Sequence, residues 1–157
     1  MPRRLVLRRS PIHGRGVFAA VDLPAGLPLI EYRGLRRTHA EADRLYGDGC
    51  RSGHTMLFTL NDRYVIDANV GGNWARFINH GCEPNCRAVV VEHPSGDPRR
   101  DRVIIETIRP IRAGEELTYD YGIVLPVPHT RELRRIWACR CGAPACTGTL
   151  LRPKSRR

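Results

Sequence analysis

The sequence predicts one mostly β domain, and three observations support this. The chain has 157 residues, 41% of them hydrophobic and 27% charged, which is enough for one core but not for two full domains. Short apolar or alternating runs are separated by turns that contain glycine and proline, as in β proteins. No apolar stretch approaches the roughly 20 residues of a membrane-spanning helix, and no signal peptide is evident near the N-terminus. We therefore expect a globular domain with no membrane partner.

The predicted elements of the first half of the chain are short strands and one helix. Residues 5–8 and 16–19 read as two strands around a turn-rich loop, and an apolar run at residues 27–32 follows the next turn. Thr38 is a suitable N-cap for a helix that continues to Gly47.

Two hairpins and a second helix are expected further along. Residues 56–60 and 64–67 flank Asn61-Asp62, and residues 88–92 and 103–108 form a similar pair joined by a longer loop. A second helix at residues 130–137 precedes the C-terminal cysteines. Residues 73–86 and 112–121 lack clean strand alternation, so we expect functional residues there.

The charge is strongly positive. The chain has 26 Lys and Arg against 16 Asp and Glu, a net charge of +10, and Lys154 is its only lysine. This favours an acidic partner such as nucleic acid, or a basic peptide held in a local acidic cleft. The excess of arginine over lysine is equally well explained by genome base composition, because the arginines are scattered except in the tail at residues 152–157.

The cysteines indicate a metal site. Cys139, Cys141 and Cys146 offer three thiolates within eight residues, and Gly142 and Pro144 allow a tight turn around one ion, most naturally zinc. A tetrahedral site needs a fourth ligand from elsewhere in the chain; the alternative is a set of free buried thiols. The candidates for the fourth ligand are Cys50, Cys82 and Cys86, followed by His129 and His80.

Two segments resemble the signature motifs of SET-domain protein lysine methyltransferases. They are Arg-Phe-Ile-Asn-His-Gly-Cys-Glu-Pro-Asn-Cys at residues 76–86 and Gly-Glu-Glu-Leu-Thr-Tyr-Asp-Tyr at residues 114–121. The similarity extends to residues 14–19, 31–34 and 64–68, and the C-terminal cysteines look like the family's post-SET zinc motif.

This resemblance implies a SET-domain β-clip fold of small curved sheets with few short helices. The segment at Asn79 and His80 would be threaded by residues 119–121 as a pseudoknot, an arrangement that is rare in proteins. The SET domain would cover residues 1–125, and a post-SET zinc segment with a basic tail would cover residues 126–157.

The resemblance also implies a site for S-adenosylmethionine and a narrow channel for a lysine of a basic protein, either a histone or a histone-like protein. The backbone of the glycine loop would lie against the methionine part of the cofactor, Asn79 at its polar end and His80 near the adenine. Cys82, rather than Cys86, would be the fourth zinc ligand. The residues implied to contact the cofactor are His13, Gly14, Arg15, Gly16, Arg76, Phe77, Asn79, His80, Tyr121 and Leu150.

The chemistry of lysine methylation agrees with these roles. A lysine with a pKa near 10.4 must lose its proton, which costs about 4 to 5 kcal/mol at pH 7. A narrow apolar channel disfavours the ammonium, and the positive sulfonium of the cofactor disfavours it further, so no strong base is needed. Tyr121 is the expected catalytic tyrosine and Tyr32 lines the channel. Tyr119 carries a hydroxyl that by analogy restricts the product mainly to monomethyl-lysine.

Three departures from the family pattern affect these expectations. Gly81 stands where the motif commonly has serine, which loosens a local hydrogen bond but leaves both flanking residues, and Met56 stands where many relatives have a channel tyrosine. The stretch between Gly34 and Thr55 is short, so the sequence does not specify the substrate peptide.

Other polar and aromatic residues are expected to have structural roles. Asp67 is expected to satisfy backbone donors at a strand end. Glu115 and Glu116 should point to opposite faces and so are not a catalytic pair. Trp74 and Trp137 are expected to be packing residues rather than stacking platforms for bases.

Two other functions remain as alternatives. A non-catalytic zinc-stabilised module that binds nucleic acid or a protein partner would explain the charge and the cysteines, and an inactive SET-like scaffold would retain the motifs without the activity. Contact with nucleic acid through the basic surface is compatible with an enzyme but not required. The arginine usage and the short chain favour a stand-alone bacterial protein that is cytoplasmic or exported to a host nucleus. Lys154 is expected to be a solvated tail residue, with automethylation as the alternative.

Overall fold

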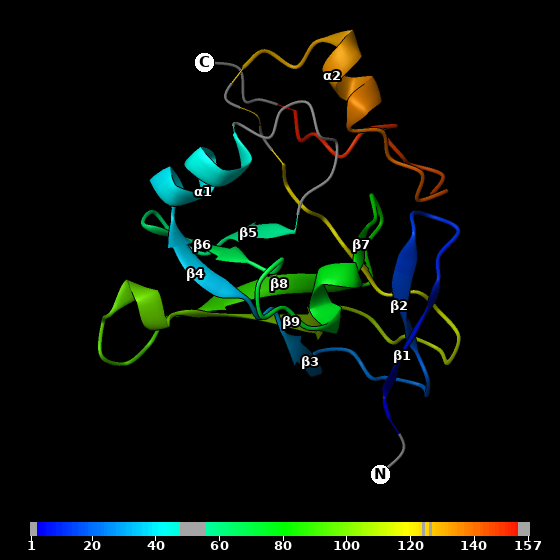
Figure 1. Cartoon of the computed structure of the whole chain (residues 1–157). Helices are drawn as coiled ribbons and strands as arrows, with labels where there is room; N and C mark the ends of the chain where they lie inside the picture. Colours follow the sequence, from blue (N-terminus) through cyan, green and yellow to red (C-terminus); the bar gives the residue numbers. More distant parts are fainter. Residues whose placement is uncertain (1–2, 48–55, 124, 126, 154–157) are drawn as a thin grey trace.

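The computed structural model of the chain describes residues 3–47, 56–123, 125 and 127–153. Cys50 and Lys154 lie outside these residues, so their suggested roles stay predictions. Short strands dominate the described parts (Figure 1). The elements in chain order are β1 (Leu5–Arg9), β2 (Arg15–Ala19), β3 (Pro28–Glu31), β4 (Leu35–Thr38), α1 (His39–Tyr46), β5 (Leu57–Thr59), β6 (Tyr64–Asp67), η1 (Trp74–Phe77), β7 (Asn79–His80), β8 (Cys86–Val91), η2 (Pro98–Arg100), β9 (Arg102–Thr107), β10 (Thr118–Tyr119) and α2 (Arg131–Ile136).

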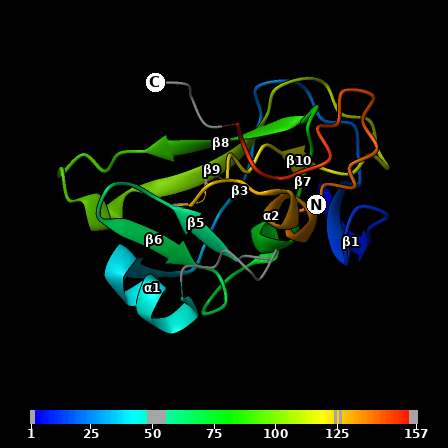
Figure 2. The ribbon, with the colours of Figure 1, turned by 90° about the horizontal axis from the view of Figure 1, so that it is seen from above.

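The strands form small separate sheets, as expected for this mostly β fold. The pairs β1–β2 and β7–β10 are two-stranded, while β3–β9–β8 and β4–β6–β5 are three-stranded sheets. Only β7 and β10 pair in parallel among the described strands, with Asn79 opposite Thr118 and His80 opposite Tyr119. This pairing confirms that the two signature segments lie side by side. In Figures 1 and 2 the orange and red C-terminal segment, which includes α2, lies near this pair.

Local sequence signals account for the predicted hairpins and helices. The side chain of Asn61 accepts hydrogen bonds from the backbone N–H groups of Arg63 and Tyr64 and so builds the turn between β5 and β6. Thr38 and Glu41 form a reciprocal capping box at the start of α1, and the side chain of Thr130 accepts from the N–H of Leu133 at the start of α2. Both helices are therefore confirmed.

The strand β4 was not predicted, because Leu35-Arg36-Arg37-Thr38 has no apolar run. It forms by pairing with β6, where Leu35 lies opposite Asp67. The Asp67 side chain is fully buried and accepts hydrogen bonds from Arg37 Nε and Tyr46 OH, both at 2.7 Å, and from the backbone N–H of Asn69 at 2.9 Å. The expected structural role of Asp67 is confirmed, and its side-chain partners also fix β4 and α1 to β6.

Two apolar clusters fill the interior. The larger unites β2, β6, β9 and the signature segments around Val17, Ile66, Ile78, Ile105 and Leu117. The second, smaller cluster lies under α2 and consists of Leu125, Leu133, Trp137 and Leu151, with Ile123, Ile136 and Leu150 packed against it. Trp137 is 3% exposed, which confirms its packing role. In the described part of the chain, no helix has the length and hydrophobicity needed to cross a bilayer.

Candidate functional site

A cavity of about 440 Å³ lies where the loop between β1 and β2, the segment from η1 to β7, and the chain after α2 meet. Its volume falls within the range of roughly 300 to 1,000 Å³ typical of small-molecule sites. Nine of the ten residues expected to contact the cofactor line it. The lining residues are Ile12, His13, Gly14, Arg15, Met56, Arg76, Phe77, Asn79, His80, Tyr121, Arg135, Ile136, Trp137, Ala138, Arg140 and Leu150.

Gly16 is the one expected cofactor residue that does not line the cavity. It is buried behind the loop, where a Cβ atom would lie 2.9 Å from the carboxyl carbon of Glu116. The absence of a side chain at Gly16 therefore lets Glu116 approach the loop, which is an indirect role that the sequence did not predict.

Asn79 and Glu116 join the loop to the signature segments. Asn79 is 8% exposed, and its Nδ2 donates to the carbonyl oxygens of His13 and Arg15 and to Glu116 Oε2, each at 3.2 Å. The Glu116 carboxylate also accepts from Ser10 Oγ, which in turn accepts from the N–H of Ile12. These bonds hold the backbone of the loop in place at one wall of the cavity.

The two adjacent glutamates diverge, as predicted. Glu115 forms an exposed ion pair with Arg109 at 3.1 Å, whereas Glu116 points inward to Ser10 and Asn79. They are therefore not a catalytic pair. The positioning role of Glu116 was missed, because its partner Ser10 is 106 residues away in the sequence.

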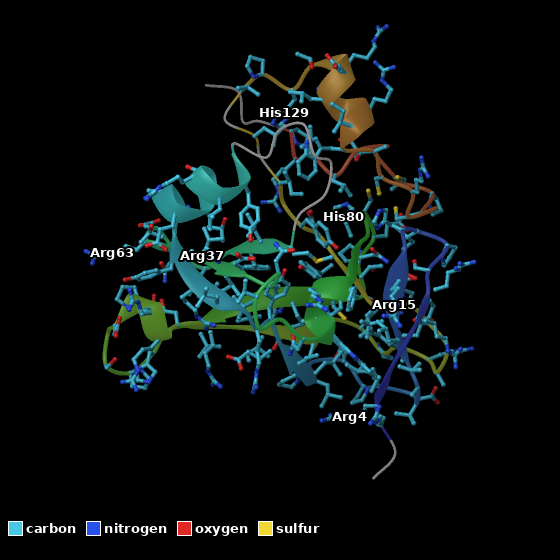
Figure 3. The ribbon with its side chains drawn as sticks, viewed as in Figure 1. Arg4, Arg15, Arg37, Arg63, His80 and His129 are labelled. Atoms are coloured by element: carbon cyan, nitrogen blue, oxygen red, sulfur yellow. The ribbon has the colours of Figure 1, made fainter. Side chains whose placement is uncertain are left out.

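His80 lies at the centre of the site, beside the sulfur atoms of the C-terminal segment (Figure 3). Its Nδ1 accepts a hydrogen bond from the backbone N–H of Tyr121 at 3.0 Å, and its ring meets the Tyr121 ring edge-on at 5.4 Å. Burial lowers the pKa of His80, against the opposing effect of the Asp120 carboxylate. The ring is therefore neutral at pH 7.

An aromatic cluster adjoins the cavity through Tyr121. The ring centroids of Tyr119 and Tyr121 are 4.9 Å apart, those of Phe58 and Tyr119 are 6.3 Å apart, and those of Tyr32 and Phe58 are 5.1 Å apart. Tyr32 and Tyr119 do not line the cofactor-sized cavity, but the cluster brings both of them to the expected catalytic tyrosine.

The tyrosines of this cluster are protonated phenols. Burial is the main cause that raises the pKa of Tyr32, Tyr119 and Tyr121 above the ordinary tyrosine value. The Tyr121 hydroxyl donates to the carbonyl oxygen of Ile78, which comes just before β7. The cluster therefore offers hydroxyl and carbonyl dipoles in an apolar setting but no ionised base.

Four cysteine sulfurs gather next to His80. The sulfur atoms of Cys82, Cys139, Cys141 and Cys146 all lie within 4.8 Å of one another. Cys82 Sγ is 3.7 Å from Cys139 Sγ and 3.8 Å from Cys146 Sγ. Zinc–sulfur bonds of about 2.3 Å in a tetrahedron require sulfur separations of about 3.8 Å, so the donor set fits a structural zinc ion.

The thiol protons respond to this crowding. Burial raises the pKa of Cys139, whereas at Cys141 the effect of burial is outweighed by backbone N–H groups of Cys82 and Ala143 and by neighbouring thiols, which lower the pKa to about 7. A thiol that ionises near neutral pH is suited to bind a metal ion as the thiolate.

The other proposed fourth ligands lie elsewhere. Cys86 is 1% exposed in the main core, where burial raises its pKa to about 12. His129 accepts from the backbone N–H of Leu125 through Nε2 and lies apart from the thiols beneath α2 (Figure 3). His80 contacts the cluster but is not one of the four residues whose ligand atoms converge.

The chain around the end of α2 supplies lining residues that were not predicted. These are Arg135, Ile136, Ala138 and Arg140, together with the packing residue Trp137. Their position next to Cys139 could have predicted this role, because a metal site that includes both Cys82 and Cys139 must bring this segment to β7. No carboxylate lines the described cavity, whereas four arginines do.

Comparison with known proteins assigns the family. Residues 14–122 match the SET domain. The chain is 41% identical over 140 residues to "Histone-lysine N-methyltransferase trithorax" of Drosophila virilis, covering 88% of this chain and 3% of that protein. It is 40% identical over 140 residues to "Histone-lysine N-methyltransferase 2B" of Homo sapiens, covering 88% of this chain and 5% of that protein. The chain thus spans only a small part of these relatives, and these relatives are eukaryotic, so a bacterial origin stays a prediction.

Solved structures give the same result. The structure of KRYPTONITE in complex with mCHG DNA and SAH aligns with a TM-score of 0.77 and 34% identity, over 96% of this chain and 29% of that one. KRYPTONITE with mCHH DNA, H3(1-15) peptide and SAH aligns with a TM-score of 0.76 and 35% identity, over 93% of this chain and 29% of that one. With its signature segments paired as β7 and β10 and its sequence matched over residues 14–122, the chain belongs to the SET-domain family.

Proposed function

We propose that this chain is an S-adenosylmethionine-dependent protein-lysine N-methyltransferase. The observation that carries the proposal is the position of Tyr121, which lines the cavity and also belongs to the aromatic cluster of Tyr32 and Tyr119. A methyl transfer needs a cofactor site and an amine site that meet at one point. The relatives named as histone-lysine N-methyltransferases and the neighbour solved with SAH support the same activity.

The cavity suits S-adenosylmethionine, which when bound supplies the methyl group. Asn79 and the carbonyl-lined loop would hold the polar end of the methionine part, and Arg15 and Arg76 flank the Phe77 ring at 5.8 and 4.7 Å. A cavity with arginines and no carboxylate favours the carboxylate of that part. Leu150 offers apolar surface for the adenine.

The aromatic cluster would prepare the lysine. Tyr32 and Tyr119 are 3% and 5% exposed, so an ammonium between them would lose its hydration and favour the neutral amine. The Tyr121 hydroxyl and the Ile78 carbonyl that accepts its hydrogen bond would orient the amine toward the cavity. Because the phenols are protonated, they orient the substrate and do not act as strong bases.

The finer features follow from the same site. The Tyr119 hydroxyl would limit the product mainly to monomethyl-lysine, and the substrate would be a basic protein such as a histone or a histone-like protein. KRYPTONITE was solved with an H3(1-15) peptide, which supports a peptide substrate for this chain. Residues 1–125 would form the SET domain and residues 126–157 the post-SET segment, consistent with the separate apolar cluster under α2.

The four cysteines would hold a structural zinc ion, with Cys82 as the ligand from the signature segment. Such an ion would fasten the C-terminal segment against β7 and so complete the cavity wall that contains Arg135 to Arg140.

The test is transfer of a labelled methyl group from S-adenosylmethionine to a panel of histones and basic bacterial proteins, followed by mass mapping. Tyr121→Phe is run in parallel. We expect label on lysine, and a rate at least about a hundredfold lower in the variant because the orienting hydroxyl is gone. Cofactor binding, measured by calorimetry, should change much less than the rate.

The alternative function is a non-catalytic zinc-stabilised module that binds nucleic acid, which the net charge of +10 favours. A zinc-loaded chain that binds DNA or RNA but not S-adenosylmethionine would support this module and contradict the enzyme. Cofactor binding without transfer to any protein of the panel, unaltered by Tyr121→Phe, would support an inactive scaffold.

A further inference from the structure

The ring of His80 has a hydrogen-bonding partner at each nitrogen. On one side Nδ1 is 3.0 Å from the backbone nitrogen of Tyr121, and on the other Nε2 is 3.6 Å from Cys82 Sγ. The residue is 5% exposed, and its backbone pairs with Tyr119 in the β7–β10 ladder. One buried side chain thus touches both the cysteine cluster and the catalytic segment.

The partner at Nδ1 fixes the tautomer of the ring. A backbone N–H can only donate, so Nδ1 must carry a lone pair and the proton of the neutral ring must be on Nε2. That proton faces Cys82 Sγ. A metal-bound thiolate is an acceptor, so an Nε2–H donor toward it is the outer-shell bond that keeps a ligand oriented.

We propose that His80 is a positioning residue that couples the zinc site to the catalytic tyrosine. By donating to Cys82 and accepting from Tyr121, it fixes the backbone of Tyr121 relative to the cysteine cluster, so binding of zinc sets the position of the Tyr121 ring. This inference rests on the zinc site of the proposed function. It concerns the side chain of His80 and is separate from any contact that this residue makes with the cofactor.

The neighbouring groups provide no substitute for this link. The carboxylate of Asp120 is 3.8 Å from Nδ1, beyond hydrogen-bond distance, and bonds instead to Gly122 N and Arg152. Cys82 Sγ is also 3.8 Å from Thr147 Oγ1, but Thr147 belongs to the C-terminal segment itself. Within the described chain, His80 is the side chain that bonds to both Cys82 and Tyr121.

Two substitutions separate the two bonds. In His80→Asn the side-chain oxygen can occupy the place of Nδ1 and accept from Tyr121, but nothing reaches Cys82. In His80→Gln the longer side chain can place an N–H near Nε2 and donate to Cys82, while the acceptor for Tyr121 is lost. Asp120→Asn is the matched control, because it removes the nearby charge and leaves both bonds intact.

The readouts are the rate of zinc release to a coloured chelator and the hydrogen exchange of the Tyr121 amide in the ¹⁵N-labelled full chain. We expect zinc release to be about tenfold faster in His80→Asn, with the Tyr121 amide still protected. In His80→Gln we expect near-normal zinc release and an amide that exchanges about tenfold faster. Asp120→Asn should change each rate by less than about twofold.

The proposed coupling also predicts an effect of zinc removal. Removal of zinc from the unsubstituted chain should accelerate exchange at Tyr121, and this effect should be much smaller in His80→Asn, where the link is already cut. If either substitution prevents folding, zinc removal from the unsubstituted chain still tests the proposal.

Three outcomes would overturn the inference. Equal changes of both rates in both variants would mean that His80 only fills space, and an unaltered Tyr121 amide after zinc removal would mean that no coupling exists. If the chain binds no zinc, the inference fails because it rests on the zinc site. Neither readout requires turnover, so a protein that shows the coupling but transfers no methyl group contradicts the proposed activity and not this inference.

Discussion

Ser10 and Glu116 are joined by a hydrogen bond of 2.5 Å between Ser10 Oγ and Glu116 Oε1, across 106 residues of sequence. Glu116 also accepts from Asn79, so one carboxylate connects the segment before β10, the strand β7 and the loop at the cavity wall. The loop conformation therefore depends on a residue that itself lies outside the cavity lining.

Glu116→Gln should weaken the binding of S-adenosylmethionine about tenfold. The substitution keeps the shape of the side chain but removes the charge that strengthens the hydrogen bonds from two donors, Ser10 and Asn79. The dissociation constant from calorimetry measures the effect.

Glu115→Gln is the matched control. Glu115 forms only an exposed ion pair, so this variant should bind the cofactor with unaltered affinity. Ser10→Ala should resemble Glu116→Gln, and the double variant should be little worse than either. Additive losses would mean that the two residues act separately.

Asp67→Asn should destabilise the fold by about 2 kcal/mol at pH 7, because a fully buried carboxylate loses charge-assisted hydrogen bonds. Burial would raise the pKa of Asp67, but bonds from Tyr46, Arg37 and Asn69 outweigh it and lower the pKa. A lowered pKa adds stability that is complete above the ordinary aspartate value of about 3.9 and is lost as the pH falls through the folded-state value.

Urea unfolding of both chains between pH 7 and pH 3 measures this difference. It should be largest at neutral pH and shrink below about pH 4. A difference that grows on acidification would contradict the lowered pKa of Asp67.

Cys82→Ser should lose zinc, whereas Cys86→Ala should retain it. Cys82 is within 3.8 Å of two other cysteine sulfurs, while Cys86 is buried in the main core. Zinc content per chain by mass spectrometry distinguishes the two. Cys86→Ala should lower the free energy of unfolding by about 1 kcal/mol, because packing in the core is lost. If Cys86→Ala loses zinc and Cys82→Ser retains it, the fourth ligand is Cys86.

Gly81→Ala should destabilise the chain by about 1 to 3 kcal/mol, because a Cβ atom there would lie 2.7 Å from Thr118 Oγ1 and 2.8 Å from Thr118 Cβ. Adding Thr118→Ala removes the hydroxyl but keeps the Cβ, so it should restore part of the loss. Denaturant unfolding of the two single variants and the double variant tests this. If Gly81→Ala leaves the free energy of unfolding unchanged, β7 and β10 separate readily.

Tyr119→Phe should shift the product toward di- and trimethyl-lysine under excess cofactor. The hydroxyl is buried beside Tyr121, and its removal leaves room for additional methyl groups on the amine. Mass increments of the product peptide measure the shift. Dominant trimethyl-lysine from the unsubstituted chain would contradict the proposed monomethylation.

The sequence predicted the parts of the fold that depend on local signals. These parts are the Asn61 turn, the Thr38 capping box and the strands at residues 88–92 and 103–108. Each of them is determined by residues that are close together in the sequence. The strand β4 was missed because Leu35 to Thr38 becomes a strand only through pairing with β6.

The residues of the candidate site were likewise predicted only in part. Motif resemblance pointed to Asn79, His80 and Tyr121, which the fold brings together at the cavity. Ser10, Glu116 and the lining residues Arg135 and Arg140 around the end of α2 were missed, because their roles come from contacts between distant segments. At Gly81, the sequence suggested a loosened hydrogen bond, whereas the structure shows that Thr118 takes the space of the absent side chain.

The pairing of β7 with β10 has a consequence for the order in which the molecule is built. The hairpins β1–β2, β5–β6 and β8–β9 each close a short loop and can form early, but two-residue strands cannot persist alone. Cys82 meets partners 57 and 64 residues further along the chain. The cavity is thus completed only after residues 139–150 have been added, so a chain truncated before Cys139 carries the motifs without a complete pocket.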